Sequence, residues 1–196
     1  MLDYPRPSPA QLAAAFGKPV PDLVAPGVRL LLCGINPSLW SAVAGCHFGN
    51  PANRLWPTLH LAGLTSRRLH PSETEDLLAA GIGVTNVVNY ATATAAEITK
   101  DQLRLGRERV VATVAQRAPE VIAFLGLSAY RTAFGRPKAV VGRQEEQIGE
   151  TVVWLLPNPS GLNAHYQLPD LARVYGELRA HLDDLAENRP PGVAPS

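Results

Sequence analysis

Two copies of the tripeptide Asn-Pro-Ser, at residues 36–38 and 158–160, contain the side chains of this 196-residue chain that are best suited to chemistry. An asparagine amide both donates and accepts hydrogen bonds, so it can orient a water molecule or read the edge of a base. It cannot act as a strong general base. The proline after each asparagine favours an extended backbone, which restricts the directions in which Asn36 and Asn158 can point.

The tripeptides follow two continuous apolar runs, residues 28–35 and 151–156, which predict buried strands. Such runs are typical of parallel strands that are covered on both faces. Ligands of open parallel sheets bind outside the carboxyl ends of the strands. If these two strands lie close together, both tripeptides therefore face one cleft. Asn-Pro is also a common turn initiator, so a pair of ordinary turns remains the competing interpretation.

Further apolar runs at residues 83–88 and 121–126 predict two more buried strands, and a weaker run at 139–141 predicts an edge strand. Helical patterns separate these runs. Strands that alternate with helices indicate βαβ units with right-handed crossovers. We therefore predict an α/β fold with a central, mostly parallel sheet of about four to five strands, flanked by helices on both faces.

Capping boxes mark the starts of two predicted helices, one at residues 72–75 and one at residues 99–102. The first helix should run to Ala80 and stop at Gly81, because glycine readily adopts the left-handed conformation that ends helices. An amphipathic pattern predicts another helix over residues 168–185.

The composition suits one α/β domain, which we place at residues 9–187, and we predict flexible tails at residues 1–8 and 188–196. Hydrophobic residues make up 46% of the chain and charged residues 18%, which indicates a real core and argues against global disorder. The net charge is only +1. Any binding of nucleic acid must therefore come from a local patch or a specific pocket.

Cysteine and histidine spacing predicts no metal or cofactor site. Cys33 and Cys46 form no CxxC pair, the histidines lack zinc-site spacing, and two thiols cannot hold a four-cysteine iron–sulfur cluster. The N-terminal residues lack the apolar core of a signal peptide, and no apolar run is long enough to span a membrane. A cytoplasmic protein is the expectation.

The segment Gly34-Ile35-Asn36-Pro37-Ser38, followed by Phe48, by residues 50–56 and by residues 158–162, resembles the mismatch-specific uracil-DNA glycosylase and thymine-DNA glycosylase family. The resemblance covers most of residues 27–185. It implies a three-layer α/β/α sandwich and removal of uracil, thymine or other damaged pyrimidines from mismatched double-stranded DNA. It also implies a monomer that needs no cofactor, acting in a bacterial-type cytoplasm and at the nucleoid during repair.

The resemblance assigns a role to each residue of the first motif region. Asn36 would be catalytic and position the attacking water, and Phe48 would stack on the flipped base. Backbone groups of Ile35 and Phe48 would contact the base edge, while Ser38 and Ser41 line the pocket. Ser38 stands where the family usually has glycine, which bears on tolerance for a 5-methyl group.

The second motif resembles the family's DNA-insertion loop. Asn158 would lie on the substrate side, and the residues that contact DNA would be Ser160, Gly161, Leu162 and Asn163. Leu162 would fill the space left by the flipped nucleotide, since an apolar wedge compensates for lost stacking. A single exposed leucine is also common on protein surfaces. Ala164 stands where related proteins often carry a basic residue.

The resemblance implies a monofunctional hydrolase rather than a lyase. A Schiff-base step needs a lysine, and neither motif contains one: the lysines are Lys18, Lys100 and Lys138. Residues 91–96, expected near the mouth of the cleft, contain no acid, and we interpret the nearby Glu97 as a solvated residue.

Two alternatives stay open beside the enzyme. One is a non-catalytic module of the same fold that binds a nucleobase or nucleotide, because asparagine rather than aspartate occupies the catalytic position. The other is an unrelated α/β hydrolase, which the sequence disfavours because it lacks a GxSxG elbow and a Walker-type phosphate loop.

Overall fold

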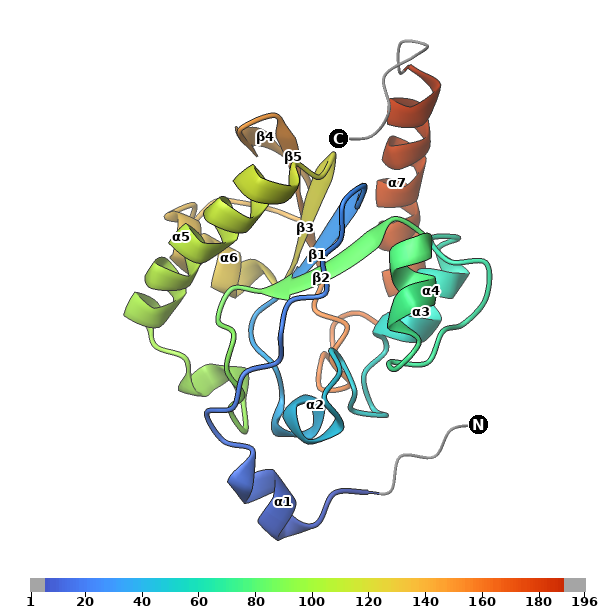
Figure 1. The fold of residues 1–196 in the computed structure, drawn as a ribbon. Helices are drawn as coiled ribbons and strands as arrows, with labels where there is room; N and C mark the ends of the chain where they lie inside the picture. Colours follow the sequence, from blue (N-terminus) through green and yellow to red (C-terminus); the bar gives the residue numbers. More distant parts are fainter. Residues whose placement is uncertain (1–5, 189–196) are drawn as a thin grey trace.

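A five-stranded sheet forms the centre of the computed structural model, which describes residues 6–188 (Figure 1). Its order is β2-β1-β3-β5-β4, and all neighbouring pairs are parallel except β4 with β5. The predicted α/β fold with a mostly parallel sheet is confirmed. The strands are β1 (Leu30–Gly34), β2 (Ile82–Asn86), β3 (Val121–Leu125), β4 (Gly142–Ile148) and β5 (Thr151–Leu156).

Burial explains which strands the apolar runs could identify. Every residue of β1, β2, β3 and β5 is buried, as continuous apolar sequences require. The predicted edge strand at residues 139–141 is wrong, because the strand in this part of the chain is β4, which lies at one edge of the sheet and begins only at Gly142. Its residues alternate between partly buried and exposed positions. One face of this antiparallel edge meets solvent, so a mostly polar sequence can form it.

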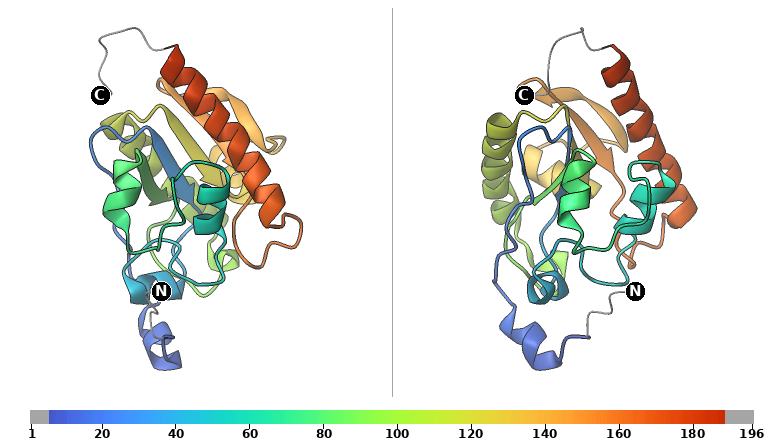
Figure 2. Two further views of the ribbon diagram at one scale, coloured as in Figure 1. Left: turned by 90° about the vertical axis from the view of Figure 1, so that its right-hand side faces the viewer. Right: turned by 45° about the vertical axis from the view of Figure 1, so that its right-hand side comes forward.

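Helices cover both faces of the sheet. One apolar cluster joins one face to α3 (Leu55–Leu61), α4 (Thr74–Ala79) and α7 (Leu168–Glu187). A second cluster joins the other face to α5 (Lys100–Arg117) and α6 (Leu127–Phe134). Figure 2 shows α5 and α7 on opposite sides of the strands. The chain is therefore a three-layer α/β/α sandwich.

Two short helices lie beyond the sheet, at the edge where the parallel strands end. These are α1 (Pro9–Ala14) and α2 (Leu39–Ala44), which contact each other and are drawn at the bottom of Figure 1. A 3-10 turn, η1 (Ala95–Glu97), follows the loop after β2. These short segments surround the carboxyl edge of the sheet.

One of the two predicted capping boxes is present. Thr99 accepts a hydrogen bond from the Gln102 amide at the start of α5, as predicted. The box at residues 72–75 is wrong, because α4 begins at Thr74 with Glu73 as its cap. The Ser72 hydroxyl lies 2.8 Å from His70 Nδ1 instead, so a local side-chain bond competes successfully with the cap.

The other helix predictions are confirmed: α4 ends before Gly81, which has a φ of 74°, and α7 starts at Leu168. The proposed tails fall mainly outside the described residues, although Ser8, within them, caps α1. No helix between residues 6 and 188 is long and apolar enough to cross a membrane.

Candidate active site

A cavity of about 660 Å³ lies at the carboxyl edge of the sheet, and both Asn-Pro-Ser loops line it. The first loop follows β1 and the second follows β5, with β3 between them in the sheet. Every predicted site residue lines this cavity: Ile35, Asn36, Ser38, Ser41, Phe48, Asn158, Ser160, Gly161, Leu162 and Asn163. The structure therefore brings the two motifs together around one hollow.

The Asn36 amide has its nitrogen fully engaged. Nδ2 donates to the carbonyl oxygens of Pro37 and Tyr90, at 3.1 and 3.2 Å, and to Thr92 Oγ1 at 2.8 Å. Thr92 Oγ1 itself donates to the Thr94 carbonyl at 2.8 Å, so it must accept from Asn36. All three partners are acceptors, which determines the orientation of the amide. Oδ1 is left without a donor among residues 6–188 and can accept from water.

Ser38 and Ser41 connect the first loop to the residues that follow it. Ser38 Oγ accepts from the Ser41 amide at 3.1 Å and thereby caps α2. Ser41 is buried, and its Oγ lies 3.0 Å from Ser38 Oγ and accepts from the Gly49 amide at 3.1 Å. The hydroxyl of Ser38 thus caps α2, and Ser38 also lines the cavity.

Phe48 has a backbone conformation that is uncommon for its type. Its φ is 51°, in the left-handed region, where a non-glycine residue is held only by its surroundings. Trp56 Nε1 donates to the Phe48 carbonyl at 3.1 Å and supplies part of that support. The Phe48 ring lies over Gly34: a Cβ on Gly34 would come within 3.2 Å of Phe48 Cζ. Glycine at position 34 therefore makes room for the aromatic ring.

Asn86 and His47 are cavity-lining residues to which the sequence analysis assigned no binding role. Asn86 ends β2 and is 2% exposed, and its Oδ1 would overlap any Cβ placed on Gly34. Asn86 Nδ2 lies 3.2 Å from His47 Nδ1. An available signal was the polar asparagine inside the apolar run at residues 83–88, where a buried amide needs a reason to be present.

The hydrogen bonds of His47 define its tautomer. Its Nε2 lies 2.8 Å from the Pro21 carbonyl, which can only accept, so Nε2 carries the proton. Burial lowers the pKa of His47, opposed by its hydrogen bond to Pro21 and by Asp22. The ring is therefore neutral at pH 7, and Nδ1 accepts from Asn86 Nδ2. This leaves Asn86 Oδ1 facing the cavity over Gly34.

Arg109, on α5, binds the carboxyl end of β2. Its guanidinium donates to the Asn86 carbonyl, to Thr85 Oγ1 at 3.2 Å and to Asp22 Oδ2 at 2.7 Å. The backbone and the side chain of Asn86 are thus fixed by two different residues. Such double support is typical of residues whose direction matters for recognition.

The second Asn-Pro-Ser loop uses its amide in the opposite way. Asn158 Oδ1 accepts from the Ser160 amide at 3.0 Å, and Asn163 Nδ2 donates to the Asn158 carbonyl at 2.9 Å. The Asn158 Oδ1 atom is therefore engaged in a hydrogen bond within a turn. Its Nδ2 has no acceptor in the described part of the chain. The two motifs differ in role: Asn36 offers an acceptor and Asn158 offers a donor.

Leu162 forms the tip of the second loop and is 92% exposed, the most exposed of the large apolar side chains described. Its amide donates to Ser160 Oγ at 3.2 Å, so the backbone beneath it is ordered. The loop therefore presents an apolar side chain to solvent on a structured turn.

The cavity wall contains no side chain that carries a formal charge at pH 7, counting His47 as neutral. Glu97 does not line it: its carboxylate accepts from the Thr94 amide and hydroxyl and caps η1. Within residues 6–188 no group of three or more histidine, cysteine or acidic side chains could hold a metal ion. The wall suits a neutral, planar, polar ligand that is read by hydrogen bonds.

Comparison with known proteins gives two results. A family model described as the uracil DNA glycosylase superfamily matches residues 21–181. The fold is also similar to that of a protein from Methanosarcina acetivorans, a candidate uracil DNA glycosylase solved by solution NMR. The TM-score is 0.60 at 17% sequence identity, over 86% of this chain and 99% of the other. At that identity the similarity concerns the fold.

Proposed function

Because the chain belongs to the uracil DNA glycosylase superfamily, we propose that it hydrolyses the N-glycosidic bond of uracil in DNA and leaves an abasic site. The observation that carries this proposal is the uncharged cavity, which is lined by Asn36 with its free oxygen, by the amide of Asn86 and by Phe48. An enzyme that acts on a base must extrude it from the helix and bind it by stacking and edge contacts.

Asn86 is suited to read uracil. Uracil presents an N3–H donor beside the O4 acceptor, whereas cytosine presents an unprotonated N3 beside an amino group. Asn86 Oδ1 can accept from N3–H, and the Nδ2 hydrogen that His47 does not use can donate to O4. Cytosine would place acceptor against acceptor and donor against donor. The His47 tautomer therefore favours uracil or thymine, and Phe48 supplies the stacking surface.

In this proposal, Asn36 orients the attacking water. Its Oδ1 accepts one hydrogen of the water, so that a lone pair of the water oxygen can face C1′ of the deoxyribose. An amide is too weak a base to deprotonate the water. The glycosidic bond must therefore break before the water attacks C1′. The glycosidic electron pair leaves with the base, and hydrogen bonds to the base oxygens stabilise its negative charge. Water then adds to C1′, and the proton that it loses passes to the base anion, which departs as neutral uracil.

The natural substrate is proposed to be mismatched double-stranded DNA containing G·U or related pairs. The exposed Leu162 supports this, because a wedge has a use only where a base pair must be opened. Ser160, Gly161 and Asn163 would then meet the DNA around the vacated position. Excision of thymine belongs to the same proposal, with Ser38 among the residues that line the cavity.

One observation favours a second candidate, a module of this fold that binds a nucleobase without chemistry. No carboxylate lines the cavity, so a strong general base is missing from its described wall. An assay for product separates the two candidates more directly than any binding measurement.

The test is to incubate the protein with labelled duplex DNA containing one U·G pair and to cleave abasic sites with alkali. Stoichiometric protein should yield product, while a matched duplex with C·G should stay intact. The variant Asn36→Ala should lose excision by about a hundredfold or more but retain DNA binding in a gel-shift assay. Binding without product by the unaltered protein would support the module and contradict the enzyme.

A further inference from the structure

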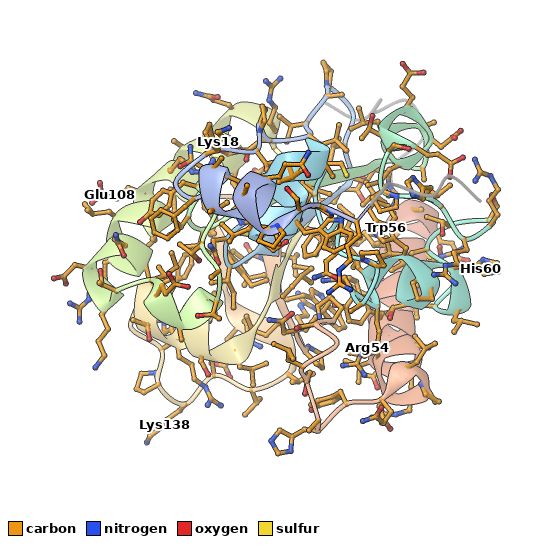
Figure 3. All side chains as sticks on the ribbon, turned by 90° about the horizontal axis from the view of Figure 1, so that it is seen from below. Lys18, Arg54, Trp56, His60, Glu108 and Lys138 are labelled. Atoms are coloured by element: carbon orange, nitrogen blue, oxygen red, sulfur yellow. The ribbon has the colours of Figure 1, made fainter. Side chains whose placement is uncertain are left out.

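We propose that Arg54 is a positioning residue that holds the loop of residues 158–166 as a pre-formed wedge before DNA arrives. This inference rests on the proposed function, because it gives the loop its role in opening a base pair. Arg54 lies at the beginning of α3, and Figure 3 shows it from the carboxyl edge of the sheet. It falls within residues 50–56, a segment of the family resemblance that assigned Arg54 no role.

The guanidinium of Arg54 binds three separate points of the loop. NH1 donates to the Tyr166 carbonyl at 2.8 Å, and NH2 donates to the carbonyls of Ser160 and Asn163, the latter at 2.9 Å. The Arg54 backbone amide adds a fourth bond, to the Pro159 carbonyl at 2.9 Å. One residue thus closes a loop that is more than a hundred positions away in the chain.

Direct packing accompanies these bonds. A Cβ on Gly161 would lie 2.6 Å from the Ala52 carbonyl oxygen, so the two backbones touch where Gly161 has no side chain. The segment beneath is itself ordered: Asn50 Oδ1 accepts from the Ala52 amide, and Asn53 Oδ1 accepts from the Leu55 amide. The loop therefore rests on a rigid support.

The same turn of α3 also holds the residue expected to stack on the base. Trp56, two positions after Arg54, donates from Nε1 to the Phe48 carbonyl. Both side chains come from the start of α3 (Figure 3). The base pocket and the wedge are consequently tied to one helix end, which sets the distance between them.

Arginine is required here for its shape. Its planar fork directs several N–H groups at once, whereas lysine offers one ammonium at a single point. No carboxylate among residues 6–188 forms an ion pair with Arg54, so backbone carbonyls are its only described partners. Without the fork, the loop that carries the exposed Leu162 would lose three hydrogen bonds that hold its backbone.

The experiment compares Arg54→Met, Arg54→Lys and Leu162→Ala with the unaltered protein, and uses Arg179→Met as the matched control. Arg179 also donates to a loop carbonyl, that of Gly63, but on α7 and outside the cavity wall. Two quantities are measured: amide hydrogen exchange in residues 160–166, and single-turnover excision of uracil from a U·G duplex and from a single strand. Thermal unfolding checks that each variant is folded.

Both Arg54 variants should lose exchange protection in residues 160–166 and excise uracil from the duplex about tenfold or more slowly. Excision from single strands, where no base pair must be opened, should change less. Leu162→Ala should slow duplex excision without changing exchange, and Arg179→Met should change neither.

Unchanged protection in Arg54→Met, or full duplex activity in Arg54→Lys, would overturn the assignment to the guanidinium fork. If the unaltered protein excises no uracil while Arg54→Met still loses protection, the proposed function fails and the structural role of Arg54 stands. Equal losses on duplex and single strand would place the effect in the base pocket and also contradict a wedge.

Discussion

At the scale of single residues, the site depends on which end of each amide is free. Asn36 and Asn158 begin two copies of the tripeptide Asn-Pro-Ser. Among the described residues, Asn36 nevertheless has a free amide oxygen, whereas Asn158 has a free amide nitrogen. The difference comes from neighbours that are distant in sequence, such as Tyr90 and Thr92. Identical local sequence therefore supports one residue that can hold water and one that shapes a turn.

Replacement of Asn36 by aspartate tests this account of the amide. A carboxylate is the stronger base, but in Asn36→Asp its second oxygen would face the three acceptors that now bind Nδ2. We expect repulsion to turn the side chain away and excision to fall by about tenfold or more. Single-turnover rates on a U·G duplex measure this, with Asn188→Ala as a distant control. A rate above that of the unaltered protein would contradict the described orientation.

His47 should show a pH dependence of defined sign. Burial lowers its pKa in the folded chain, while the unfolded chain keeps an ordinary value of about 6.5. Below pH 6.5 the unfolded chain then binds more protons, so the His47 contribution makes the free energy of unfolding decrease as pH falls. NMR of the ring nitrogens should show the Nε2–H tautomer and a titration midpoint below 6.5. A midpoint above 6.5 would refute the neutral acceptor at Nδ1.

At the scale of elements, α5 positions the end of β2 through a close backbone contact. A Cβ on Gly106 would overlap the Val87 carbonyl, and Arg109, one turn later, binds the Asn86 carbonyl. Glycine inside a helix normally lowers stability relative to alanine. Here it allows α5 to approach the loop that carries the cavity wall.

A pair of glycine substitutions tests that contact with opposite expected signs. Gly106→Ala should destabilise the protein by about 1–3 kcal/mol, because the new methyl group overpacks against Val87. Gly176→Ala, inside α7, meets nothing within 4 Å and should stabilise by up to about 1 kcal/mol. Urea unfolding of both variants measures the difference. Equal stabilisation by both alanines would show that α5 does not need the close approach.

At the scale of the whole molecule, basic and acidic side chains nearly cancel, with 18 lysines and arginines against 17 aspartates and glutamates. The net charge is +1, and many arginines form ion pairs with carboxylates: Arg29, Arg67, Arg104, Arg109, Arg136, Arg173 and Arg179. The cavity wall adds no charge of its own. Under the proposed function, we therefore expect DNA recognition to rely less on phosphate attraction than on the pocket and the proposed wedge.

This charge distribution predicts a shallow salt dependence of DNA binding. With about two to four phosphates neutralised, the slope of log K against log salt should lie near −2 to −4. Fluorescence anisotropy with a U·G duplex at several salt concentrations gives the slope, and Asn36→Ala prevents turnover during the measurement. A slope near that of proteins with about ten phosphate contacts would contradict a pocket-dominated mode.

The sequence by itself determined the buried strands, the parallel sheet and the two motifs at one edge. It could do so because strands that are covered on both faces need continuous apolar runs. In addition, the carboxyl ends of parallel strands lie at the same edge of the sheet. The polar strand β4 could not be predicted in this way. Its residues alternate between partly buried and exposed positions, so it has no continuous apolar run. The predicted capping box at residues 72–75 is absent because α4 begins at Thr74, which leaves Ser72 outside the helix and beside His70.

Only the tertiary structure decided what the motifs can do. The orientation of Asn36, the His47–Asn86 pair and the hold of Arg54 on residues 158–166 each join positions far apart in the chain. Hydrogen bonds of this kind depend on direction and on distances of about 3 Å, which spacing along a sequence does not encode. Apolar burial tolerates many arrangements and leaves a readable pattern, whereas a polar site exists only once the fold has placed its partners.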